Sequence, residues 1–101
     1  VLALNLRWGL LAPLSVDYHL FVHLVDQEGR LWTQKDSRKP TSGWQPGEEI
    51  EDKQAMLLPH DIPPGQYQIV VGFYILETGQ RLTLNDGQDN LRLGSVEVVV
   101  E

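Results

Sequence analysis

The sequence of 101 residues contains no cysteine, which excludes a disulfide framework and thiol chemistry. Basic residues are also few, since 8 Lys and Arg stand against 14 Asp and Glu and give a net charge of -6. Nucleic-acid binding depends on clustered cations that neutralise phosphates, so this balance argues against a nucleic-acid partner. No apolar run approaches the roughly 20 residues that a membrane-spanning helix needs. The sequence therefore predicts no transmembrane segment in this chain.

Helical periodicity is missing as well. No segment places apolar residues at i, i+3, i+4 and i+7 between helix caps, so no substantial helix is expected. The hydrophobic residues, 42% of the chain, instead recur mostly in period-two alternation, the mark of strands with one buried face. A chain this short has room for one core. We predict a single domain over residues 1–101, and its start at Val1 inside an alternating pattern favours excision from a longer polypeptide.

About seven short strands are predicted, separated by turn signals at intervals of roughly ten residues. This spacing is typical of an antiparallel β-sandwich, and we expect one of immunoglobulin-like type. A small barrel or jelly roll is the alternative that the pattern leaves open. The expected strands cover residues 2–10, 18–24, 31–36, 50–58, 66–75, 81–84 and 93–100.

One corner of the chain has a recognisable composition. Residues 57–71 (LLPHDIPPGQYQIVV) resemble the corner of fibronectin type III and immunoglobulin-like domains, where a Pro-Gly turn precedes a tyrosine that opens the next strand. The resemblance implies that Tyr67 is the corner tyrosine. Its phenol would bond to an upstream backbone carbonyl and fix the crossover between the two sheets.

A wider resemblance is carried by short segments along most of the chain, namely DY at 17–18, FVHL at 21–24, WQPGE at 44–48, LP at 58–59, PPGQY at 63–67, VGFY at 71–74 and TGQRL at 78–82. Together they resemble a β-sandwich module found towards the C-terminus of bacterial membrane proteins of the dolichyl-phosphate-mannose mannosyltransferase-like class. In such proteins the transmembrane part carries the transferase chemistry and the sandwich lies outside the membrane. The resemblance implies an extracytoplasmic accessory domain tethered through its parent protein, and it carries over no catalytic residue.

Several aromatic and polar side chains alternate onto one face if the second, third, fifth and seventh predicted strands share a sheet. Flat rings beside imidazole and amide groups are typical of sugar recognition. Exposed aromatic surface on an excised domain is also typical of a lost contact with a neighbouring domain or a protein partner. We expect a non-catalytic interaction domain, with a carbohydrate-binding module as the alternative. The candidate ligand-binding residues are His19, Phe21, His23, Trp32 and Tyr74.

The polar loop at residues 85–90 (NDGQDN) offers carboxylate and amide oxygens around a glycine, the ligand type that Ca²⁺ prefers. The glutamate of a full calcium-binding loop is missing, so a polar turn is the simpler interpretation. The candidate calcium ligands are Asp86, Asp89 and Asn90. No nucleophile motif is present, so we expect no catalytic residue and no cofactor.

Overall fold

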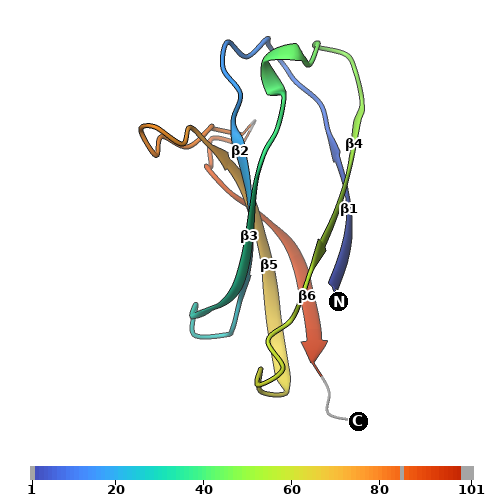
Figure 1. Cartoon of the computed structure of the whole chain (residues 1–101), viewed down its shortest axis with the longest axis vertical. Coiled ribbons are helices and arrows are strands. Elements are labelled where there is room, and N and C mark those ends of the chain that lie inside the picture. Colours follow the sequence, from blue (N-terminus) through green and yellow to red (C-terminus); the bar gives the residue numbers. More distant parts are fainter. Residues whose placement is uncertain (1, 85, 99–101) are drawn as a thin grey trace.

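A computed structural model describes residues 2–84 and 86–98, which form six strands and one 3₁₀ turn, Thr41–Gly43. All strand pairs are antiparallel, and they build a two-stranded sheet, β1-β4, and a four-stranded sheet, β3-β2-β5-β6. The two sheets lie on opposite sides of the molecule in Figure 1, so the predicted all-β sandwich is confirmed. In the described part of the chain, no helix is long and apolar enough to cross a membrane. The strands are β1 (Leu2–Trp8), β2 (His19–Val25), β3 (Leu31–Arg38), β4 (Ile50–Met56), β5 (Gly65–Tyr74) and β6 (Leu91–Val98).

Six of the predicted strands are present, and their described ends differ from the expected ones by at most two residues. Residues 99 and 100, expected to end the last strand, lie outside the described residues. The strand expected at 81–84 is reduced to an isolated bridge between Arg81 and Tyr74. The Leu82 amide also donates to the Phe73 carbonyl at 2.9 Å, after which the chain leaves β5 and enters the polar loop.

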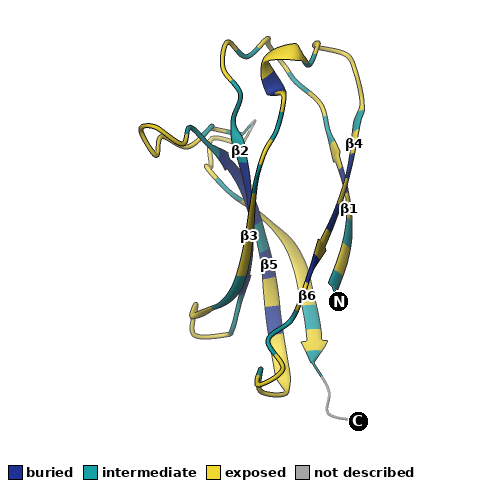
Figure 2. Ribbon diagram, in the orientation of Figure 1, coloured by how far each residue is buried: buried dark blue, intermediate teal, exposed yellow. Residues whose placement is uncertain are grey.

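The core lies between the sheets and follows the period-two alternation of the sequence. Alternate residues of β2 and β5 face the two-stranded sheet, where residues of β1 and β4 meet them. Figure 2 shows this as buried segments along β2 and β5. The buried core residues are Leu6, Leu20, Val22, Leu24, Met56, Tyr67, Ile69, Val71 and Phe73.

Tyr67 fixes the corner at which the chain crosses from β4 in one sheet to β5 in the other. Its hydroxyl donates to the Pro63 carbonyl at 2.7 Å, which is the upstream hydrogen bond predicted from the sequence. Burial raises the pKa of Tyr67, and the negative charge of Asp26 raises it further. The phenol therefore stays a hydrogen-bond donor at neutral pH.

One long side of the sandwich is closed where β3 approaches β4. Lys39, just after β3, donates to the buried Asp52 carboxylate of β4 at 2.8 Å. Trp8 and Gln54 donate to the same carboxylate at 3.2 and 2.6 Å. Burial raises the pKa of Asp52, but these hydrogen bonds and the Lys39 charge outweigh burial and hold that pKa below its ordinary value.

The opposite long side, between β1 and β6, is open. Among the described residues, no Cα atom of β1 lies within 8 Å of one in β6. Within residues 2–84 and 86–98, each of these strands pairs on one edge only, β1 with β4 and β6 with β5. Because two strands face four, the two-stranded sheet leaves part of the opposite sheet uncovered, and every residue of β6 is exposed or only half-buried (Figure 2).

Candidate functional site

The outer face of the four-stranded sheet brings together four of the five predicted ligand-binding residues. His19, Phe21 and His23 alternate with the core residues of β2 and therefore point away from the two-stranded sheet. The strand register sets Tyr74 of β5 directly opposite His19. The ring centroids of His19 and Tyr74 are 5.5 Å apart, and those of Phe21 and His23 are 4.7 Å apart.

Phe21 is not the exposed ring that the sequence predicts, because only 2% of its surface is accessible. Its ring lies over Gly72, where a Cβ atom would overlap the ring. The Arg81 guanidinium stacks on the ring, with its central carbon 4.7 Å from the ring centroid. An isolated glycine inside a strand often marks such close packing, so Gly72 was the signal in the sequence for a filled site.

Tyr74 and His23 keep the polar character of this face. The Tyr74 hydroxyl donates to the Asp36 carboxylate of β3 at 2.6 Å, and this hydrogen bond, together with partial burial, raises the pKa of Tyr74. Burial lowers the pKa of His23, and the Arg81 charge lowers it further against the opposing effect of Asp36. At neutral pH this face therefore presents a neutral phenol and a predominantly neutral imidazole.

Trp32, the fifth candidate, lies away from this face. The register between β2 and β3 shifts after Leu24, so that Trp32 is an extra residue without a direct partner on β2. Its ring meets the core residue Tyr67 edge-on, with centroids 6.5 Å apart, and its indole N–H donates to Asp26 at 2.9 Å. The expected alternation fails here because a bulge shifts the side-chain direction by one residue.

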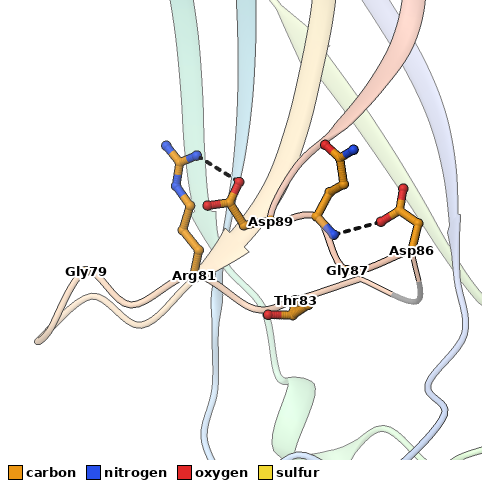
Figure 3. A pocket seen from close by; sticks show the side chains of 7 residues that line it. Gly79, Arg81, Thr83, Asp86, Gly87 and Asp89 are labelled. Carbon is orange, nitrogen blue, oxygen red and sulfur yellow. Dashed lines mark hydrogen bonds and ion pairs between the residues drawn. The ribbon is translucent and has the colours of Figure 1, made fainter.

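The loop after the Arg81 bridge lines an open, polar pocket of about 840 Å³ (Figure 3). Asp89 turns towards Arg81, with a side-chain distance of 3.5 Å, and also accepts from the Asn90 amide. Asp86 accepts from the Gln88 backbone N–H at 3.0 Å instead. Within residues 2–84 and 86–98, no group of three or more His, Cys, Asp or Glu side chains converges as metal ligands would. The geometry is that of a polar turn, and calcium binding by Asp86, Asp89 and Asn90 stays a prediction.

A second pocket, of about 490 Å³, opens at the end of the sandwich where β1 and β5 finish, and we call it the end pocket. Sequence reasoning missed it because its walls come from loops as well as strands. Its one buried polar side chain, Thr41, is satisfied, since its hydroxyl donates to the Val16 carbonyl and accepts from the Tyr18 N–H. Leu11 lies among the lining residues and is 85% exposed. The apolar walls are formed chiefly by Trp8, Leu10, Trp44, Phe73, Leu82 and Leu84.

The chemistry of the end pocket follows from this lining. With its buried hydroxyl satisfied, the pocket offers mainly apolar contact area to an occupant. The other polar residues in its lining are Arg7, Thr83 and Asp86. Trp8 and Trp44 both meet Phe73 edge-on, with ring centroids 4.7 and 6.3 Å away, which fixes the inner wall. An apolar side chain is the occupant that such a surface favours. A scan of protein-family models finds no match to the chain, and neither do searches of curated proteins and of solved structures.

Proposed function

We propose that this chain is a non-catalytic interaction domain of a larger, membrane-associated bacterial protein, and that it acts outside the membrane. Its partner is a neighbouring domain or another protein, and the binding surface is the end pocket. The observation that carries this proposal is an apolar pocket beside an almost fully exposed leucine, Leu11. Exposed apolar surface of this kind marks interaction sites on soluble domains. The location outside the membrane rests on the resemblance of the sequence segments.

The strand order supports an immunoglobulin-like topology for this domain. In that fold strands B and E pair in one sheet, while C′, C, F and G form the other. The pairs β1-β4 and β3-β2-β5-β6 fit that order when β1 is taken as strand B and β6 as strand G. Tyr67 then lies near the start of strand F, where the corner tyrosine of this fold belongs.

Selection from a phage-displayed peptide library tests the interaction proposal. We expect enriched peptides to share an apolar or aromatic residue and to lose affinity about tenfold with Leu11→Lys. Leu57→Lys is the matched control, because Leu57 is another strongly exposed leucine that does not line the end pocket. Failure to enrich any peptide, or peptides that ignore Leu11→Lys, would contradict binding through the end pocket.

Carbohydrate binding on the outer face is the second candidate function. It is favoured by the Tyr74 and His19 ring pair, which lies beside the Asp36 carboxylate and near Arg81. An aromatic ring for the apolar face of a sugar and charged groups for its hydroxyls are the usual components of such a site.

A glycan array with two variants separates this candidate from the first. Tyr74→Ala removes the central ring and should abolish any glycan signal. Trp32→Ala removes an aromatic side chain that lies away from this face and should leave the signal unchanged. A signal that persists in Tyr74→Ala, or no signal for the unmodified chain, would remove this candidate.

A further inference from the structure

The inner face of β6 is apolar and only partly covered, since Val96 and Val98 are half-buried against the core. Val96 pairs with Tyr67 and Leu91 pairs with Val71, and directly paired residues share a face of the sheet. Tyr67 and Val71 belong to the core, so Val96 and Leu91 also face inwards. Yet Leu91, which also lines the end pocket, is 40% exposed, while Val71 is fully buried. The inner face of β6 is therefore covered less completely than that of β5.

The free edge of β1 borders this partly covered surface. β1 pairs with β4 in an unbroken register from Leu2 to Trp8, with no bulge and no proline. The edge of β6 is different, because a register shift falls at Arg92 and Leu93, and Gly94 follows with a φ of +134°. Bulges are a common device that prevents an edge strand from pairing further. The regular edge, β1, is therefore the one suited to another strand.

We propose that a single extended strand of a partner polypeptide pairs with the free edge of β1 and covers the inner face of β6. About seven residues match the length of β1, and alternate side chains of the added strand would be apolar. They would contact an inner surface without charged side chains, formed by Leu2 and Leu4 of β1 and by Leu91, Val96 and Val98 of β6. This inference rests on the proposed interaction function and adds a second contact surface, beyond the end pocket, together with the conformation in which the partner binds there.

Overlap of the four-stranded sheets disfavours a second folded copy as the occupant. A copy paired through its own β1 would bring its four-stranded sheet along, and its β6 would need the space already taken by β6 of the first molecule. A lone strand brings no second layer. It adds backbone hydrogen bonds to β1 and buries apolar side chains on β6, which is how strand addition gains affinity.

Amide hydrogen exchange of the whole chain tests this inference. The probe is a synthetic nine-residue peptide that alternates Val or Ile with Thr and carries a lysine at each end. Its control is a peptide of the same composition with the apolar residues placed together. We expect the alternating peptide alone to slow exchange of the β1 amides that do not bond to β4, by about tenfold or more. The free edge of β6 should keep its exchange rate.

Substitutions on the two faces of β6 test which face contacts the peptide. Val96→Lys should weaken peptide binding about tenfold, whereas Ser95→Lys on the opposite face of the same strand should change it by less than roughly twofold. Val96→Thr is the milder variant if Val96→Lys lowers stability. Protection of the β6 edge instead of β1, a dimer of the chain alone, or equal binding of both peptides would overturn strand addition. If strand addition is overturned but the library-selected peptides still lose affinity with Leu11→Lys, the proposed interaction function is not contradicted.

Discussion

The two long sides of the sandwich differ in whether the chain itself covers the gap between the two sheets. On the closed side, Lys39 and the buried Asp52 form an ion pair, and Lys35 donates across the gap to the Ala55 carbonyl at 3.2 Å. On the open side, β1 and β6 do not approach each other, and the residues that face the gap are apolar. The closed side is completed by the chain itself, while the open side presents the surface that a partner strand would bury.

The ion pairs of the closed side and of β1 also differ in how far they are exposed to solvent. The side chains of Lys39 and Asp52 are 19% and 6% exposed, whereas those of Arg7 on β1 and its partner Glu49 are 69% and 66% exposed. A buried charge depends on every partner it has, because water cannot replace a lost one. An exposed pair is screened by solvent and contributes little. Substitutions in the two ion pairs should therefore differ strongly in their effect on stability.

Among the substitutions of charged residues, the largest effect is expected for Asp52→Ala on the closed side. The substitution leaves the Lys39 ammonium, the Trp8 indole N–H and the Gln54 amide without their shared acceptor. We expect a loss of about 3 kcal/mol in the free energy of unfolding, measured by urea denaturation. A loss below roughly 1 kcal/mol would mean that the closed side does not depend on this carboxylate.

Lowering the pH should weaken the contacts of the closed side more than the apolar contacts of the open side. The folded-state pKa of Asp52 lies below its unfolded value, so its stabilising contribution is complete above about pH 4 and is lost as the pH falls through the folded pKa. The effect should be smaller than that of Asp52→Ala because the protonated side chain keeps its hydrogen-bonding oxygens. Asp17 and Asp26 also have lowered pKa values, through hydrogen bonds from Ser42 and Trp32 respectively.

A matched variant isolates the Asp52 part of this acid sensitivity. Stability is measured by denaturation from pH 7 down to pH 2 for the unmodified chain and for Asp52→Asn. We expect the two stability curves to converge in acid, because the variant has no carboxylate at this position to protonate. Curves that stay parallel throughout would show that the charge of Asp52 does not support the closed side.

The sequence predicts the strands and the Tyr67 corner, but it does not predict the ion pair between Lys39 and Asp52. Period-two alternation and turn signals together located β1 to β6, and the Pro-Gly corner predicted the Tyr67 hydrogen bond, because all of these depend on local pattern. The contact joins Lys39, just after β3, to Asp52 on β4 of the other sheet, and no local spacing encodes it. Long-range pairing of this kind depends on how the sheets meet, which appears only in three dimensions.

On the open side, Leu91→Ala should cost about 1 kcal/mol, because the leucine is only half-covered. Leu24→Ala is the matched control, since Leu24 is fully buried and the same truncation should cost about 3 kcal/mol there. Both values come from urea denaturation. Equal losses would mean that the inner face of β6 is packed in solution, and the contrast between the two sides would disappear.

The candidate site was less predictable than the fold, for three physical reasons. Trp32 was assigned to the outer face by alternation, and a bulge shifts it towards Tyr67. Phe21 was assigned as an exposed ring, but Gly72 and Arg81 enclose it. The end pocket was missed because it needs Trp8 and residues from distant loops together. Each of these depends on contacts between segments, whereas alternation reports only the strand on which a residue lies.

The smallest effect is expected for Arg7→Ala on the exposed face of β1. Arg7 pairs with Glu49 at 3.1 Å and lies 4.0 Å from Glu51, and all three side chains are exposed. We expect a change below about 0.5 kcal/mol in the free energy of unfolding, and one that shrinks further in high salt. Lys39→Met is the comparison on the closed side, because it leaves the buried Asp52 carboxylate without its cation and should cost several times more. Similar losses for the two variants would mean that burial does not distinguish these ion pairs.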